Sequence, residues 1–304
     1  MSRALLALVS ALLLAQPGGS WATASRLNEG RAEIAAAVLG DQVYVAGGFD
    51  SDGSDLFSVE SYDPRLDSWT YRPSMPRGLN HLGLASLGGV LYVVGGNQRG
   101  TPTSGLWAFD PIANSWSRRA DLPLRRSAAA VVAAAGRIFV FGGVGDRPGP
   151  TLSYDPSIDT WDLRAPIPTL REHVAAAVVD DRVYVVGGRW TNLGNLPTNE
   201  MYDPATDAWQ MLPPMSTPRG GLTVAALRGQ VHVLGGEACD PRRTFAQHEV
   251  FDPATNTWSG APALPTPRHG LGSAVVDDQL YVVAGGTSAG LSTSQITEVF
   301  RLAQ

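Results

Sequence analysis

The sequence has few of the features that locate chemistry easily. It contains one cysteine, Cys239, among 304 residues, so no disulfide can form within the chain. It has no nucleophile elbow, no zinc-binding HExxH helix and no phosphate-binding loop. Lys and Arg number 23 against 28 Asp and Glu, which gives a formal net charge of −5. This balance argues against nucleic acid or an anionic membrane as the main partner.

Long hydrophobic runs are also scarce. The run from Ala4 to Ala15 follows Arg3 and is too short to span a bilayer. This pattern predicts a secretory signal peptide over residues 1–19 and a secreted or periplasmic protein, with a small-x-small sequence at residues 22–24 as the alternative cleavage site. No later run is long enough to cross a membrane, so we expect no membrane insertion once the signal is removed.

One spacing recurs six times, while no segment of the mature chain keeps the 3.6-residue period of a helix. In each copy a tryptophan is followed by a double glycine or its equivalent, 26 residues later in five copies and 27 in the sixth: Trp21 and Gly47, Trp69 and Gly95, Trp116 and Gly142, Trp161 and Gly187, Trp209 and Gly235, and Trp258 and Gly285. A period of about 50 residues indicates one supersecondary unit repeated in space.

Each repeat reads as four short strands. In the fourth copy these are residues 173–179, 183–186, 200–202 and a strand opened by Trp209, separated by Gly, Pro and Asp clusters. Four-stranded antiparallel sheets repeated around an axis make a β-propeller. The apolar residue six positions after each tryptophan is expected to fill the space between neighbouring sheets.

The repeat resembles the kelch motif. It has a double glycine after an apolar strand, then a turn such as Tyr202-Asp203-Pro204, then the tryptophan. The resemblance implies an all-β, six-bladed kelch propeller over residues 20–304, with no cofactor. The last repeat stops before its fourth strand, so we expect residues 20–27 to complete that blade and close the ring.

An arginine precedes the first strand of each repeat. These residues are Arg31, Arg77, Arg126, Arg171, Arg219 and Arg268. The kelch resemblance implies that arginines here line the central pocket and bind acidic peptides. Guanidinium groups suit carboxylate or phosphate recognition through paired hydrogen bonds. The alternative is structural, with each arginine bonding carbonyls or a carboxylate of a neighbouring blade.

Further candidates lie close to these arginines. His81, His173 and His269 belong to blades two, four and six, and three imidazoles can bind Zn or Cu. Their offsets differ and no carboxylate spacing supports a ligand set, so we expect ligand binding here and no metal. Trp190 follows a double glycine and Arg189 and is the best single candidate for an aromatic contact. Cys239 is expected to be an inert loop thiol.

These observations favour a monomeric binding module. Its long, variable loops lie on one face, where a rigid scaffold concentrates binding residues. We expect this face to recognise an acidic protein or an acidic small molecule. An enzyme acting on an acidic sugar is the alternative, because secreted sialic-acid mutarotases are also six-bladed kelch proteins. A purely structural module is the third possibility, so the question of catalysis stays open.

Overall fold

The computed structural model describes residues 18–303 of the chain. Every regular element among them is a β-strand, and they contain no helix that is long and apolar enough to cross a membrane. The signal peptide predicted over residues 1–19 lies almost wholly outside the described residues and stays a prediction.

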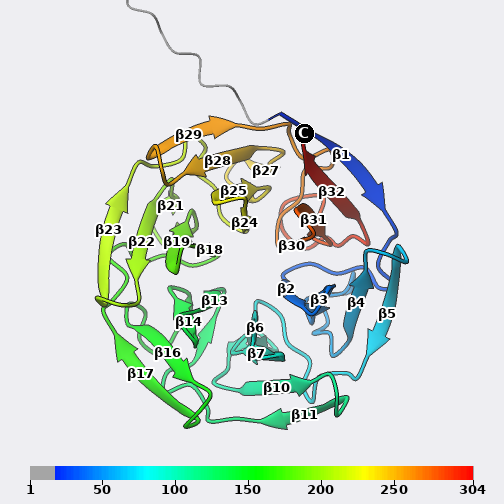
Figure 1. Cartoon of the computed structure of the whole chain (residues 1–304), viewed down its shortest axis with the longest axis vertical. Helices are drawn as coiled ribbons and strands as arrows, with labels where there is room; N and C mark the ends of the chain where they lie inside the picture. The colour runs from blue at the N-terminus through cyan, green and yellow to red at the C-terminus, as the bar shows by residue number, and fades with distance from the viewer. Residues whose placement is uncertain (1–17, 304) are drawn as a thin grey trace, which may run out of the picture.

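Six four-stranded antiparallel sheets surround a central channel (Figure 1). Blade 1 contains β2 (Ala35–Leu39), β3 (Gln42–Ala46), β4 (Val59–Asp63) and β5 (Ser68–Arg72). Blade 2 contains β6 (Gly83–Leu87), β7 (Val90–Val94), β10 (Leu106–Asp110) and β11 (Ser115–Arg118). Blade 3 contains β13 (Ala130–Ala134), β14 (Arg137–Phe141), β16 (Thr151–Asp155) and β17 (Thr160–Arg164). Blade 4 contains β18 (Ala175–Val179), β19 (Arg182–Val186), β22 (Asn199–Asp203) and β23 (Ala208–Leu212). Blade 5 contains β24 (Thr223–Leu227), β25 (Gln230–Leu234), β28 (His248–Asp252) and β29 (Thr257–Gly260). Blade 6 contains β30 (Gly272–Val276), β31 (Gln279–Val283), β32 (Thr297–Leu302) and β1 (Gly19–Ala24).

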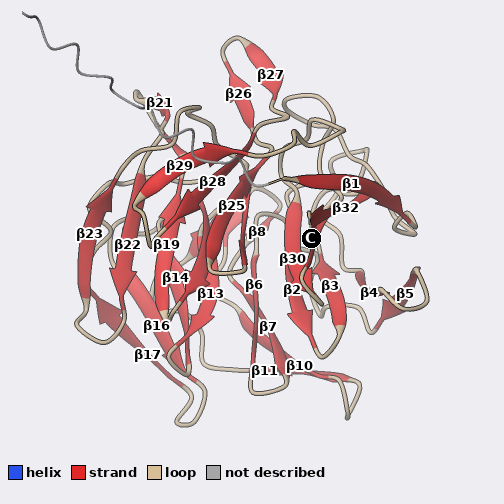
Figure 2. Ribbon diagram, turned by 45° about the horizontal axis from the view of Figure 1, so that its top comes forward, coloured by secondary structure: helices blue, strands red, loops and turns tan. Residues whose placement is uncertain are grey.

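Four small two-stranded sheets involve the loops that follow the double glycines; in three of them both strands lie on one such loop, and in the fourth one strand directly precedes the first strand of blade 3. They are β8 (Asn97–Gln98) with β9 (Thr101–Pro102), β12 (Arg126–Ser127) with β15 (Val144–Gly145), β20 (Arg189–Trp190) with β21 (Gly194–Asn195), and β26 (Glu237–Cys239) with β27 (Arg242–Thr244). The β26–β27 hairpin stands out from one side of the ring (Figure 2). We call this side the loop face.

The ring closes through the N-terminal strand, as the sequence predicts. Strand β1 pairs antiparallel with β32 and places Trp21 opposite Phe300. The strand ends at Ala24, earlier than expected, but Leu27 is still buried. This pairing leaves no blade with a missing outer strand and so removes an open sheet edge.

The repeated tryptophans join neighbouring blades. Each indole N–H donates to a backbone carbonyl of the preceding blade: Trp21 to Pro262, Trp69 to Ser25, Trp116 to Pro73, Trp161 to Ala120, Trp209 to Ala165 and Trp258 to Pro213. The apolar residues six positions later are all buried between sheets, as expected: Leu27, Met75, Leu122, Ile167, Met215 and Leu264. Both sets are therefore structural.

The double glycine lets the next blade approach closely. Gly47 has a φ of 59°, and a Cβ atom there would lie 2.3 Å from the carbonyl oxygen of Leu79. The Gly48 N–H donates to that same carbonyl at 2.8 Å. The glycines thus permit the hydrogen bond that docks blade 2 on blade 1.

Candidate functional site at the channel mouth

One residue of each blade forms a ring at the loop-face mouth of the channel. These six ring residues all have positive φ, between 49° and 62°: Glu33, His81, Ala128, His173, Gly221 and Gly270. From blade 2 to blade 6 the N–H of each donates to the carbonyl of the previous one at 2.8–3.0 Å, and Ile34 N–H closes the circuit to Gly270 at 3.3 Å. The ring therefore holds its side chains on a fixed backbone.

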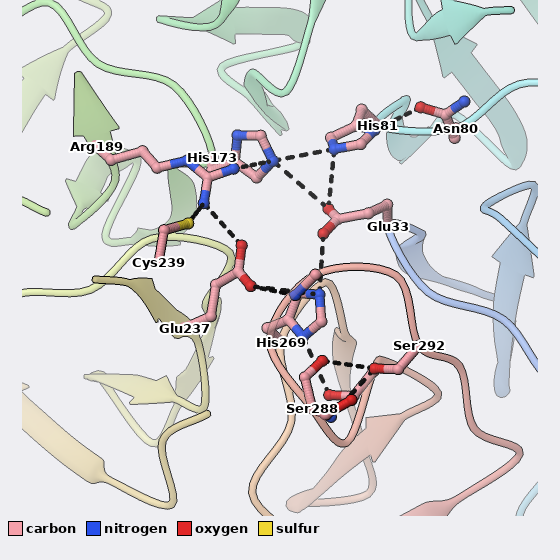
Figure 3. Close-up of polar contacts among 12 residues, drawn as sticks. Glu33, Asn80, His81, His173, Arg189, Glu237, Cys239, His269, Ser288 and Ser292 are labelled. Atoms are coloured by element: carbon pink, nitrogen blue, oxygen red, sulfur yellow. Dashed lines mark hydrogen bonds and ion pairs between the residues drawn. The ribbon is translucent and has the colours of Figure 1, made fainter. Parts of the chain in front are cut away.

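Three of the six ring residues carry side chains that meet at the centre (Figure 3). His81 Nε2 lies 3.3 Å from Glu33 Oε2 and 3.0 Å from His173 Nε2. His269, one residue before Gly270, places its Nε2 atom 3.6 Å from Glu33 Oε1. The structure thus brings together all three predicted histidines around a glutamate that the sequence reasoning missed.

Arg189 and Glu237 complete what we call the mouth cluster, together with Glu33, His81, His173 and His269. Both directly follow a double glycine, in β20 and β26. The Arg189 guanidinium donates to Glu237 Oε1 at 2.7 Å, to Glu172 Oε1 at 2.8 Å and to His173 Nε2 at 2.9 Å. One cation is therefore shared between two carboxylates and an imidazole.

Burial shifts the proton affinities of this cluster. It lowers the pKa of His81 to about 4, with the positive charge of Arg189 acting in the same direction. Burial also lowers the pKa of His173 well below its ordinary value, and it raises the pKa of Glu33. For Glu237 burial acts upward, but His269, Arg189 and the Gly290 N–H outweigh it and lower the pKa. The imidazoles of His81 and His173 are thus neutral at neutral pH.

Four of the predicted arginines do not line the mouth. Arg31, Arg171, Arg219 and Arg268 are completely buried inside their blades, each paired with a glutamate of the third strand: Glu60, Glu200, Glu249 and Glu298. They also donate to backbone carbonyls of their own blade. The expectation that their side chains face the channel is wrong, because these contacts already use the guanidinium groups. Their role is structural, as in the alternative, but their partners belong to the same blade and not to a neighbouring one.

The remaining two arginines differ from these four. Arg126 is buried without a carboxylate and donates to the carbonyls of Arg125 and Arg147. Arg77 is exposed and donates to Gln98 Oε1 at 3.1 Å. It lies two residues before the position that the other arginines occupy, and that position holds Leu79 in blade 2.

Arg77 borders a second candidate site, which we call the blade-2 pocket. It has a volume of about 210 Å³ and is lined by Arg77, Leu79, Gln98, Thr103, Ser104, Gly105, Trp107, Arg118 and Arg125. The Arg118 guanidinium lies over the Trp107 ring, 5.4 Å from its centroid. Trp190 is half-buried in β20, outside this pocket, and Cys239 is exposed, 3.3 Å from Arg189 Nη1.

The sequence reasoning missed Glu33, Arg189 and Glu237 because it looked for residues shared by the repeats. The other blades carry Phe49, Asn97, Val144 and Gly286 where Arg189 and Glu237 stand. The ring itself is completed by alanine and glycine. The available signal was a departure from the repeat at a position next to the channel. The histidines were instead singled out because they lie close to the arginines in blades two, four and six.

The family comparison agrees with this architecture. A family model described as the KLHDC2/KLHL20/DRC7 Kelch-repeats domain matches residues 20–188 and 119–286, so the chain belongs to the kelch-repeat family. Among solved structures, one titled "Structure of YjhT" superposes with a TM-score of 0.77 at 17% identity, over 91% of this chain and 96% of that one. That likeness concerns the fold.

Curated relatives match shorter stretches. Beta-scruin of Limulus polyphemus is 36% identical over 76 residues, which is 25% of this chain and 8% of that protein. Human Kelch-like protein 34 is 36% identical over 78 residues, which is 25% of this chain and 12% of that protein. The matched region is thus a small part of each relative's length.

Proposed function

We propose that the chain is a secreted or periplasmic interaction module that recognises an acidic segment of a protein partner on its loop face. The blade-2 pocket is the observation that carries this proposal. Three arginines, Arg77, Arg118 and Arg125, surround one cavity with Trp107 beside them. Guanidinium groups next to an aromatic ring suit a carboxylate on an apolar stem.

The pocket has cationic capacity to spare. Arg118 is paired with Asp121 and Arg125 with Asp146, and all four side chains are at least one-third exposed. The hydrogen-bond partner of Arg77 is the neutral amide of Gln98. An incoming carboxylate can therefore bond Arg77 without displacing a carboxylate of the protein itself.

The surrounding loops favour a protein over a small ion. Phe57 is exposed beside the blade-2 pocket, next to Gly78, while Leu193, Leu291 and the half-exposed Trp190 lie on loops of other blades on the same face. Apolar side chains around a polar pocket are typical of protein-binding surfaces. Kelch propellers supply such a face on a rigid ring, which lowers the ordering cost of binding.

Titration with acidic and charge-reversed peptides tests this proposal. Fluorescence polarisation should show binding of Asp- and Glu-rich peptides that weakens with added salt, because the pocket is partly exposed. Arg77→Ala should weaken binding by about 1.5–3 kcal/mol if its bond to the peptide is charge-assisted. Arg65→Ala is the matched control, since Arg65 is equally exposed but lies in an Asp-Pro turn away from the loop face. Equal binding by the parent protein and an Arg77→Ala/Arg125→Ala variant would refute the proposal.

A second candidate is an enzyme that acts on an acidic sugar, and the mouth cluster favours it. Arg189 could hold the sugar carboxylate, while Glu33 and the neighbouring imidazoles could exchange a proton with the ring oxygen or a hydroxyl. Following the interconversion of sialic-acid anomers by NMR tests this candidate. Acceleration by the parent protein that disappears in Glu33→Gln would favour catalysis, and no acceleration would leave the binding module.

A further inference from the structure

We propose that Glu33, His81 and His173 bind a divalent transition-metal ion of the Zn²⁺ class at the channel mouth. This site is independent of the blade-2 pocket and uses none of its residues. The Nε2 atoms of two histidines meet Glu33, the Nδ1 atoms contact hydrogen-bond acceptors, and the propeller fold does not require these side chains.

The separations between the ligand atoms fit one ion. His81 Nε2 is 3.0 Å from His173 Nε2 and 3.3 Å from Glu33 Oε2, and His173 Nε2 is 3.9 Å from that same oxygen. For Zn²⁺ bound at about 2.0–2.1 Å, tetrahedral ligands lie about 3.3 Å apart. The three observed distances bracket that value, so small side-chain movements would bring all three atoms into the coordination sphere.

The hydrogen bonds of the other ring nitrogen fix each tautomer. His173 Nδ1 contacts the carboxylate of Glu172, and His269 Nδ1 lies 3.1 Å from the carbonyl oxygen of Gly286. Both partners can only accept, so both Nδ1 atoms carry the hydrogen. The Nε2 atom of His173, which accepts from Arg189, therefore directs its lone pair at the centre of the cluster.

His81 has the same tautomer. Its Nδ1 atom contacts Asn80 Oδ1, and the Asn80 amide is oriented by donation from Nδ2 to Asp55. The pattern in which Nδ1–H donates to an oxygen while Nε2 remains a lone pair is typical of metal-ligating histidine. His81 and His173 both follow it.

The centre of the cluster is therefore rich in acceptors and poor in donors. The Nε2 atoms of His81 and His173 face each other at 3.0 Å with no hydrogen between them, and His269 Nε2 lies 3.6 Å from oxygens of both Glu33 and Glu237. A proton on Glu33 would serve only one of these acceptors. Arg189 donates a hydrogen bond to one more of these acceptors, His173 Nε2. A divalent cation would satisfy the remaining lone pairs together.

Arg189 would have to move for His173 to bind the ion. Its guanidinium already bonds Glu237 and Glu172, so it can keep these two contacts while it leaves His173 Nε2. Glu33 would ligate through Oε2, while Oε1 stays towards His269. Two imidazoles and one carboxylate suit Zn²⁺ and its neighbours better than Mg²⁺ or Ca²⁺, which prefer oxygen ligands alone.

The propeller does not require these side chains. The same ring conformation is built with Ala128, Gly221 and Gly270 in the other three blades. The hydrogen-bonded ring backbone holds the ligands in place, and their side chains are 12–13% exposed, so an ion could enter from the loop face. The site is thus preorganised on the scaffold and accessible.

Metal titration of untagged protein, dialysed first against EDTA, tests the proposal. Calorimetry with Zn²⁺ should show saturable binding of about one ion per chain. Co²⁺ loading should give intense visible d–d bands, which report a four- or five-coordinate protein-bound ion without reference to any activity. Parent protein that shows neither signal would overturn the proposal whatever the variants do.

Variants then locate the ion. His81→Gln and His173→Gln should each abolish the Co²⁺ bands, whereas Glu172→Gln should weaken Zn²⁺ binding by about 10–100-fold through His173. Cys239→Ser is the matched control, because this exposed thiol lies beside Arg189 and could bind Zn²⁺ on its own. Loss of binding in Cys239→Ser, or in His269→Gln while His81→Gln still binds, would contradict the assigned ligands. Thermal melts in EDTA verify that each variant is folded.

Discussion

Blade 4 holds Arg171 and Glu200 as a fully buried ion pair, whereas blade 2 holds Leu79 and Trp107 at the same two positions. In blade 2 the two side chains pack in one apolar cluster. Both partners are exchanged together, so neither blade leaves a buried charge alone. Replacing a buried ion pair by well-packed apolar residues is often neutral for stability. The blades thus solve this packing problem in more than one way, and blade 3 shows a third arrangement, in which Arg126 stands with Leu152 and donates to carbonyls of Arg125 and Arg147.

The mouth cluster contrasts with both blades. Its residues occupy positions where the chain varies from blade to blade, and their polar atoms face one another across the channel rather than within a sheet (Figure 3). Regular positions hold the ring together, and irregular positions beside the channel carry the polar side chains of the mouth cluster. This distinction can be tested by substitutions at matched positions.

The largest expected effect comes from breaking the ion pair on one side only. Arg171→Leu leaves Glu200 buried without its partner and should destabilise the fold by about 3–5 kcal/mol. Arg171→Leu/Glu200→Leu should recover part of that loss, since blade 2 tolerates an apolar pair. Urea unfolding measures both, with the surface pair Arg65–Asp41 as the control site. If Arg171→Leu costs no more than Arg65→Leu, the buried pairs have been misjudged.

Trp21→Ala should have the next largest effect, because it acts on ring closure. The side chain packs against Phe300 and His248 and donates to Pro262 at 2.9 Å. We expect a loss of about 3 kcal/mol, at the lower end for a tryptophan because Trp21 is only half-buried. The same substitution at Trp161, the equivalent residue of a covalently continuous blade, is the comparison. A larger loss at Trp161 than at Trp21 would mean that the closing strand contributes less than the other outer strands.

These two positions illustrate how far the sequence predicts the molecule. The Trp-to-Gly-Gly spacing and the missing last strand are enough to predict six blades and closure through Trp21, because each residue acts within a unit that repeats. Arg171 was misplaced because its sequence position, just before the first strand, does not reveal which way the side chain turns. The available clue was that a glutamate accompanies the arginine in blades 1, 4, 5 and 6 and that Leu79 and Trp107 replace both in blade 2, although blade 3 keeps Arg126 with Leu152.

The mouth cluster was less predictable for a physical reason. Glu33, Arg189 and Glu237 are far apart in sequence and meet only because the ring brings blades 1, 4 and 5 to one axis. His81 and His173 could be suspected from their place near the channel. Their contact through two Nε2 atoms depends on the left-handed backbone at the ring, which no local pattern announces for a histidine.

Acid should destabilise blade 5, because a buried histidine of this blade replaces the Tyr or Phe of the other blades. His232 occupies the strand position where other blades carry Tyr44, Tyr92, Phe139, Tyr184 and Tyr281, and its Nδ1 lies 2.8 Å from His248 Nε2. Burial lowers the pKa of His232 from 6.5 to about 3 and that of His248 to about 4. Below pH 6.5 both histidines take up protons in the unfolded chain but stay neutral in the folded chain. The free energy of unfolding is therefore highest above pH 6.5 and decreases towards pH 4.

Each imidazole that stays neutral in the folded chain should lower the free energy of unfolding by about 2 kcal/mol at about pH 5. His232→Tyr introduces the aromatic residue type of the other blades and should remove the part of this loss that comes from His232. His81 and His173 contribute a loss of the same sign in both proteins. Urea unfolding at neutral pH and near pH 5 gives the comparison. An identical pH dependence in His232→Tyr and the parent protein would show that this pair does not control acid stability.

The smallest expected effect is at the ring itself. A Cβ atom at Gly221 would meet no atom closer than 3.6 Å, and Ala128 already occupies the equivalent position with a φ of 52°. Gly221→Ala should therefore cost less than about 1 kcal/mol, the left-handed penalty being offset by the reduced freedom of the unfolded chain. At Gly143 the added atom would lie 2.5 Å from the carbonyl oxygen of Ser127, so Gly143→Ala should cost clearly more. Thermal unfolding of the two variants separates a position that the ring leaves open to other side chains from one that the repeat requires to be glycine. Equal losses would mean that the ring is as constrained as the repeat, and the histidines and Glu33 would then need a structural explanation.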